Sequence, residues 1–221
     1  MPSIPSIPSL LACTRSAVVI MAVSAAVAGC ASSPPTNFYT LAGATPTAAM
    51  TPLPKRSPLV VALGPVTLPD YVDRPQIVTR ESAYAVKLAP YDQWAGPLND
   101  MVPRVLVEGV AAALPGDRVV GFPQVSGTAF DYRIAVEVTR FDADQTGSAT
   151  LVARWQIYDR AARPAVLVTD GTFTRPVADS SYEAIVAAMS GTLADLSGRL
   201  ADDVAVVTAA GQTRSSVPSG R

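Results

Sequence analysis

The sequence lacks histidine altogether, has two cysteines, and its lysines are Lys55 and Lys87. Without histidine, Ser-His-Asp and Cys-His catalysis, histidine-ligated zinc and a charge switch near neutral pH are excluded. Neither lysine lies in a glycine-rich loop that opens a helix, so the chain has no P-loop and any ATPase must be another subunit. We therefore expect no cofactor and no metal site.

Clustered positive charge is also missing. The formal net charge is −1, and the arginines are spread singly along the chain. Nucleic-acid grooves need concentrated positive charge. The sequence therefore indicates that the protein binds no nucleic acid.

The chain opens with a targeting signal. A 13-residue run of small and apolar residues, Ser16–Ala28, follows Arg15 and is too short for a membrane span, which takes about 20 residues. It ends in Val-Ala-Gly-Cys, the form of a lipobox, which predicts a lipoprotein signal peptide over residues 1–29 and a lipid-modified Cys30. The alternative is a chance Gly-Cys pair after a signal anchor.

The two cysteines are then both accounted for. Cys13 leaves with the signal peptide and Cys30 carries lipid, so the mature domain has neither a disulfide nor a free thiol. Ala31 follows the lipidated cysteine. By resemblance to Gram-negative lipoproteins, a residue other than aspartate there implies sorting to the outer membrane.

A tether precedes the folded domain. Residues 30–57 are rich in Pro, Thr and Ala and cannot bury enough apolar surface to become ordered. The short segment Phe38–Leu41 is predicted as an edge strand; the alternative is a sticky patch in a flexible linker. We expect the domain to cover residues 58–208 and a disordered tail to cover 209–221.

The first half of the domain predicts three strands and a helix. Val60, Ala62 and Val66 mark one face of a strand that Leu68-Pro69 ends, because proline cannot donate to a sheet ladder. A loop, the strands Gln76–Arg80 and Tyr84–Leu88, and Trp94 in a second loop follow. Asn99 or Asp100 is expected to cap a helix to about Leu114, because Pro103 is tolerated only in a first turn. Its buried stripe is predicted to be Val102, Leu106, Val110 and Ala113 or Leu114.

The second half predicts three consecutive antiparallel strands and a long helix. Apolar residues alternate along 130–138 and 149–157, a turn over Asp142–Ser148 joins these segments, and Ala165–Arg175 follows. The helix begins with a capping box of Ser180 and Glu183 and ends near Val207. Its apolar stripe predicts packing on a sheet, with self-association as the alternative. The residues of this stripe are Tyr182, Ile185, Val186, Met189, Leu193, Leu196, Leu200 and Val204.

Two segments of the chain carry a family resemblance. The run LGPVTLPDYVDRPQIVTR, which contains Gly64–Arg80, and the element QWAGPL, Gln93–Leu98, are similar to the PqiC-like lipoproteins. These are auxiliary lipoproteins of ABC-type and MCE (mammalian cell entry) lipid transport systems. The resemblance implies a lipid-trafficking role, with MCE-domain and permease subunits as partners. Pro103 departs from the family pattern.

The loop Pro69–Pro75 is the candidate partner-contact surface. Terminal prolines reduce the entropy lost on binding, and tyrosine and arginine are enriched where interfaces concentrate their energy. The predicted partner-binding residues are Pro69, Tyr71, Asp73, Arg74, Arg80 and Trp94. The alternative is an internal salt bridge from Asp73 to Arg74 or Arg80 that only holds the hairpin.

No catalytic constellation stands out. The loop pair Asp142/Asp144 is expected to be solvated, the side chains of Asp202 and Asp203 are expected to diverge on a helix, and the chain has no G-x-S-x-G elbow. We therefore predict a non-enzymatic, outer-membrane-anchored periplasmic lipoprotein of an ABC/MCE-type lipid transport complex. A second copy of the chain, in a homo-oligomer, is a further candidate partner. Its predicted fold is α+β, a mixed and largely antiparallel sheet covered by two main helices. Alternatives are an assembly-assisting envelope lipoprotein of another machine and, more distantly, an envelope hydrolase.

Overall fold

The computed structural model describes residues 34–43, 57–122, 129–144, 147–160 and 164–215. The predicted signal peptide, Cys30 and most of the tether lie outside these residues. The elements, in chain order, are β1 (Asn37–Tyr39), β2 (Val60–Thr67), β3 (Gln76–Arg80), β4 (Val86–Trp94), α2 (Leu98–Ala113), β5 (Arg118–Gly121), β6 (Tyr132–Asp144), β7 (Ser148–Asp159), β8 (Leu167–Pro176) and α3 (Tyr182–Ser215).

The strands form one mixed sheet. The antiparallel pairs all join strands that are consecutive in the chain: β3 with β4, β6 with β7, and β7 with β8. Strands from more distant parts of the chain pair parallel: β1 with β4, β2 with β5 and with β6, and β3 with β6. The α+β class and the mixed sheet are confirmed, and the expected antiparallel pairing holds for β3 with β4 and for β6, β7 and β8.

Strand β6 organises the sheet. β7 pairs along nearly the whole of one of its edges, from Tyr132 to Ala143. On the other edge, β2 pairs with the first half of β6 up to Glu137, and β3 pairs with its end from Ala143. β2 and β3 therefore share one edge of β6 in tandem, and the loop between them must run past the middle of that edge.

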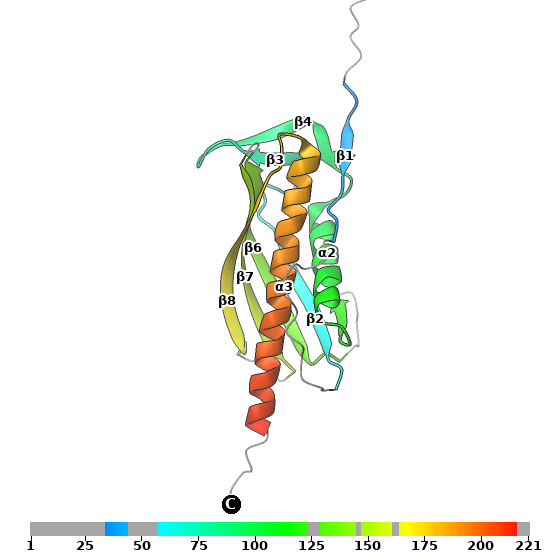
Figure 1. Ribbon diagram of the computed structural model, residues 1–221, viewed down its shortest axis with the longest axis vertical. Helices are drawn as coiled ribbons and strands as arrows, with labels where there is room; N and C mark the ends of the chain where they lie inside the picture. The colour runs from blue at the N-terminus through cyan, green and yellow to red at the C-terminus, as the bar shows by residue number, and fades with distance from the viewer. Residues whose placement is uncertain (1–33, 44–56, 123–128, 145–146, 161–163, 216–221) are drawn as a thin grey trace, which may run out of the picture. The chain divides into compact units, whose positions relative to one another are not determined.

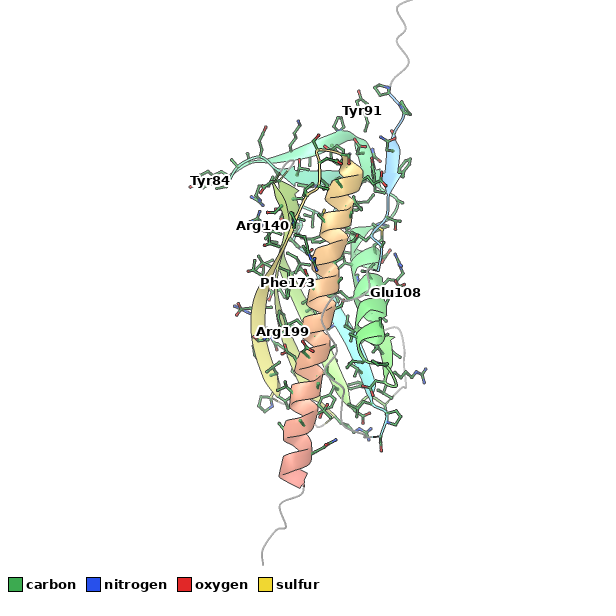
Figure 2. The ribbon with its side chains drawn as sticks, in the orientation of Figure 1. Tyr84, Tyr91, Glu108, Arg140, Phe173 and Arg199 are labelled. Atoms are coloured by element: carbon green, nitrogen blue, oxygen red, sulfur yellow. The ribbon has the colours of Figure 1, made fainter. Side chains whose placement is uncertain are left out.

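Both helices pack on the sheet and against each other (Figure 1). The predicted buried stripe of α2 is confirmed, and Glu108 lies on its outer side (Figure 2). The stripe of α3 is also buried, apart from the half-buried Tyr182, so it serves packing within the chain. The helices touch closely at Gly109, where any Cβ would collide with the side chain of Ser197.

Several expected boundaries in the first half are wrong. α2 begins at Leu98, which places Pro103 in its second turn. The carbonyl that proline leaves without a donor belongs to Asn99, an exposed residue where water can bond to it. β4 continues to Trp94, because Pro90 falls in a bulge that needs no ladder donor.

Burial in β2 also differs from the one-faced pattern expected. Val61 and Leu63 are buried together with Ala62. β2 lies between β5 and β6, so it is an interior strand. An interior strand covered on both faces reads as continuously apolar rather than alternating.

Two expectations in the second half need correction. The cap of α3 is Ser181, whose hydroxyl accepts the N–H of Ala184 at 3.1 Å, so Ser180 and Glu183 form no capping box. The helix continues to Ser215, past the expected end near Val207. β1 at Asn37–Tyr39 agrees with the predicted edge strand, and the three consecutive antiparallel strands are confirmed.

Candidate functional site

The loop between β2 and β3 is fixed by its own backbone and by one apolar side chain. The N–H of Val72 donates to the carbonyl of Pro69 at 3.1 Å, and the N–H of Arg74 donates to that of Val72 at 2.8 Å. The side chain of Val72 is buried in the core. Tight turns with a buried apolar residue hold a loop in one conformation.

Tyr71 fills a gap in the sheet. The N–H of Phe141 on β6 lies between the last residue paired with β2 and the first residue paired with β3. It donates instead to the hydroxyl of Tyr71, at 3.2 Å. A buried amide without an acceptor is costly, so this hydroxyl replaces a missing strand partner.

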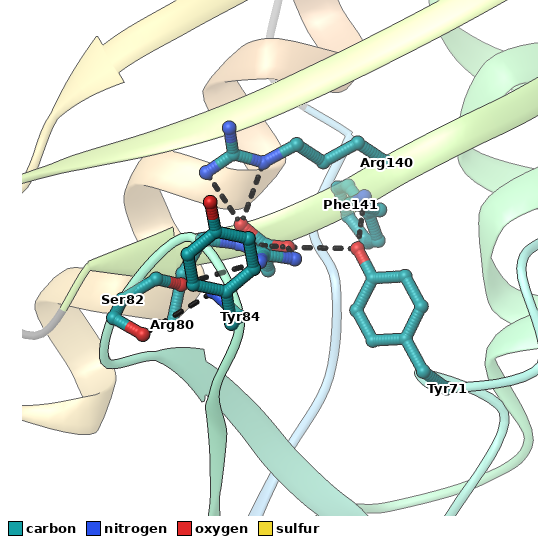
Figure 3. A network of polar contacts seen from close by, with 7 residues as sticks. Tyr71, Arg80, Ser82, Tyr84, Arg140 and Phe141 are labelled. Carbon is teal, nitrogen blue, oxygen red and sulfur yellow. Dashed lines mark hydrogen bonds and ion pairs between the residues drawn. The ribbon is translucent and has the colours of Figure 1, made fainter.

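The same hydroxyl belongs to a network of polar contacts, drawn in Figure 3, in which Asp142 is the shared acceptor. One carboxylate oxygen, Oδ2, accepts the Tyr71 hydroxyl at 2.7 Å and Arg80 Nη2 at 2.6 Å. The other oxygen, Oδ1, accepts Arg140 Nε at 2.9 Å. The Asp142 side chain is fully buried, so the carboxylate depends entirely on these donors.

The cluster has a defined charge state. Burial by itself raises the pKa of Asp142, but hydrogen bonds from Arg80, Tyr71 and Arg140 outweigh it and hold the pKa below its ordinary value. The hydrogen bond to Asp142 raises the pKa of Arg80, and burial raises the pKa of Tyr71. Asp142 is therefore ionised at neutral pH, opposite the charged guanidinium of Arg80.

The remainder of the loop faces solvent. Asp73, Arg74 and Pro75 are exposed, and Pro69 is half-buried. Within the described ranges, the side chains of Asp73 and Arg74 make no hydrogen bond or ion pair. The charged side chains of Asp73 and Arg74 thus face solvent, while Tyr71 and Val72 fix the backbone of the loop through their contacts inside the domain.

The predicted site residues separate into two groups. Tyr71 and Arg80 point into the Asp142 cluster, whereas Asp73 and Arg74 point outward. The alternative, an internal salt bridge from Asp73 to Arg74 or Arg80, is wrong: among the residues described, Arg80 pairs with Asp142 instead. Trp94 is 4% exposed at the end of β4, so its expected loop position was wrong.

Sequence reasoning missed Asp142, which was expected to be a solvated turn residue. The turn is shorter than predicted, because β6 extends to Asp144 and β7 begins at Ser148. Phe141 and Ala143 on either side are apolar, and this was the available signal that the strand continues. Asp203 is buried and accepts Trp155 Nε1 at 2.8 Å, whereas Asp202 is exposed, so these two carboxylates diverge as expected.

A groove of about 590 Å³ lies between β2, the strand that precedes the loop, and the outer face of α2. Its apolar walls are formed by Pro65, Val66, Val107 and Phe122, and Arg104 also lines it.

No group of His, Cys, Asp and Glu residues in the described part of the chain could hold a metal ion. None of the helices described is long and apolar enough to cross a membrane.

These features define an α+β domain with a rigidly held surface loop. A family profile, the ABC-type transport auxiliary lipoprotein component, matches residues 39–201. The chain belongs to this family. The matched segment contains the loop, its Asp142 cluster and most of α3.

Solved structures show the same fold. A Xanthomonas campestris protein in a domain family of unknown function is 21% identical, with a TM-score of 0.64; the match covers 82% of this chain and 100% of that one. An uncharacterised protein is 20% identical, with a TM-score of 0.63, covering 77% and 99% respectively. The search of curated proteins returned no significant match.

Proposed function

We propose that this protein is the outer-membrane-anchored periplasmic lipoprotein subunit of an MCE-type lipid transport complex. The observation that carries the proposal is the family match over residues 39–201, together with the lipobox that ends at Cys30. The protein acts by binding rather than catalysis, since the family is auxiliary and the chain lacks histidine. Its partners are the MCE-domain and permease subunits.

The docking surface is the loop Pro69–Pro75. Asp73 and Arg74 make the direct contacts, with Pro69 beside them, because these side chains face solvent. Tyr71 and Arg80 hold the loop region through Asp142, and the N–H of the buried Trp94 donates to the carbonyl of Pro75 at 2.7 Å. A loop already held in one conformation loses little entropy on binding, which favours its use as a contact.

Charge reversal at Arg74 tests the docking surface. We expect Arg74→Glu to melt like the wild type but to lose co-purification of the MCE-domain and permease subunits. Arg118→Glu is the matched control, because Arg118 is exposed on β5, away from the loop in sequence and sheet position. Retained co-purification with Arg74→Glu would refute the loop as docking surface.

The anchor is tested separately. Cys30→Ser removes the only acceptor for lipid that the lipobox offers, so the variant should be released into the periplasm or remain unprocessed in the inner membrane. Outer-membrane fractionation like that of the wild type would refute the lipoprotein assignment. Subunits of an unrelated envelope machine in the co-purified material would instead favour the alternative, an assembly-assisting lipoprotein.

A further inference from the structure

Exposed apolar side chains gather at the β3–β4 hairpin. Tyr84 is fully exposed at its tip, Val86, Leu88 and Tyr91 are about two-fifths exposed on β4, and Phe38 is 65% exposed on the neighbouring β1. We call these five residues the hairpin patch. Figure 2 shows Tyr84 and Tyr91 at the same end of the domain. The other large exposed apolar residues described are valines on the β7–β8 connection, β8 and α3.

Strand register places most of the patch on one face. Leu88 pairs with Val78, and Gln93 pairs with Gln76. Gln76 and Val78 are two residues apart on β3 and share a face of the sheet, so Leu88 and Gln93 lie on that face as well. Phe38 pairs with Gln93, so its side chain lies on the same face as those of Leu88 and Val86. The patch is thus one surface and not a scatter of single residues, which distinguishes it from ordinary exposed side chains.

The tether limits how far this surface can lie from a membrane. Asn37, the first residue of β1, lies seven positions after Cys30. An extended chain spans at most about 3.6 Å per residue, so roughly 25 Å is the longest possible reach. Because β1 pairs with Asp92–Trp94 of β4, a lipid on Cys30 limits how far this end of the hairpin, with Phe38 of the patch, can lie from the bilayer surface.

The composition of the patch suits a phospholipid surface. Tyrosine and phenylalanine rings settle at the boundary between headgroups and acyl chains, and valine and leucine add apolar area that lipid can cover. Glu81 and Lys87 are exposed on the same hairpin, and their charges offset one another. Contact should therefore depend on apolar insertion, with little dependence on salt or anionic lipid.

We propose that the hairpin patch rests in the headgroup region of the bilayer that holds the Cys30 lipid, so that the domain is oriented on the membrane instead of swinging on its tether. This inference rests on the anchor in the proposed function. A second copy of the chain is the competing occupant of the patch, and the experiment below separates the two.

Single introduced cysteines provide a clean test. The mature chain has Cys30 as its only cysteine, and lipid blocks it, so a fluorescent label attaches only where a new cysteine stands. Lipidated Tyr84→Cys and Leu88→Cys proteins, labelled with an environment-sensitive dye, are bound to phosphatidylethanolamine/phosphatidylglycerol vesicles. Val168→Cys and Val206→Cys are the controls, since both residues are exposed and lie outside the hairpin.

We expect nitroxide-labelled lipid to quench the dye at least twofold more at Tyr84→Cys and Leu88→Cys than at the controls, at low and at high salt. Equal quenching at all four positions on vesicle-bound protein would overturn the inference and leave the anchor intact. A hairpin dye that is shielded from water and shows energy transfer between copies of the chain, but is not quenched by lipid, would overturn the inference in favour of self-association. Failure of the lipidated protein to float with vesicles would refute the anchor and the inference together.

Discussion

The guanidinium of Arg80 and the carboxylate of Asp142, 62 positions apart in the sequence, join β3 to β6 through two hydrogen bonds to the same oxygen. Arg80 Nη2 lies 2.6 Å and Nε 3.0 Å from Asp142 Oδ2. The pair lies near the point on the edge of β6 where pairing with β2 has ended and pairing with β3 begins. One arginine of the family-like motif therefore secures the strand that follows the candidate docking loop.

The Asp142 cluster should contribute strongly to stability. Asp142→Ala removes the acceptor shared by Tyr71, Arg80 and Arg140, and breaking a buried ion pair costs on the order of 3 kcal/mol. Urea unfolding measures this loss. Glu108→Ala is the control, because its pair with Arg104 is half-exposed and should contribute less than about 1 kcal/mol. Similar losses for both variants would contradict the buried network.

Stability should fall in acid partly through Asp142. The pKa of its carboxyl is lowered in the folded state, so its contribution is present above the unfolded value of about 3.9 and is lost as pH falls through the folded value. Urea unfolding from pH 7 to pH 2 measures this slope. Asp142→Asn, which cannot titrate, should flatten the curve below about pH 4. An unchanged slope would show that other carboxylates dominate.

The hydroxyl of Tyr71 should matter independently of its ring. Tyr71→Phe leaves the N–H of Phe141 without its acceptor and takes one donor from Asp142, at a cost of about 1 to 3 kcal/mol. Amide hydrogen exchange at Phe141 should accelerate by more than the change in global stability explains. If Phe141 stays as protected as in the wild type, the bond does not act as a substitute strand pairing.

Trp155 should behave as a core residue. Its side chain is fully buried, and Trp155→Ala should cost about 3 to 5 kcal/mol. Trp155→Phe keeps most of the apolar contact but removes the donor to Asp203, so it should cost less. Val206→Ala, at a position 62% exposed, is the control and should melt like the wild type. A wild-type melting temperature for Trp155→Ala would refute the packing described.

Three glycines allow backbone strain and collision to be separated. Gly64 has φ +138°, and a Cβ there would collide with the carbonyl oxygen of Phe122. Gly116 has φ +95° in open space, and Gly96 has neither constraint. Gly116→Ala should cost about 1 to 2 kcal/mol. Thermal melts should rank the losses as Gly64→Ala above Gly116→Ala above Gly96→Ala, and any other order would contradict this account.

Local patterns predicted the elements well where one face is buried and the other is wet. Alternation identified β6 and β7, because successive side chains of a strand point to opposite faces. Three- and four-residue spacing identified the buried stripes of α2 and α3. Boundaries failed where tertiary contacts extend an element, as at Trp94, where pairing with β1 continues β4.

The sequence predicted only part of the candidate site. The exposed positions of Asp73 and Arg74 follow from a proline-bounded loop of charged residues. The inward direction of Tyr71 and Arg80 does not, because their partner, Asp142, lies on a strand about 60 to 70 residues further along. An aspartate in the sequence looks the same whether it faces water or is buried against three hydrogen-bond donors.

The sequence alone determined the lipobox, the alternating strands, the apolar helix stripes and the family to which the chain belongs, because each depends on residues close together in the chain. Only the tertiary structure decided that β2 and β3 share one edge of β6, that Asp142 is buried between Tyr71, Arg80 and Arg140, and that β1 holds the hairpin patch near the tether. Parallel pairing joins segments remote in sequence, and such contacts leave no periodic signature for local patterns to reveal.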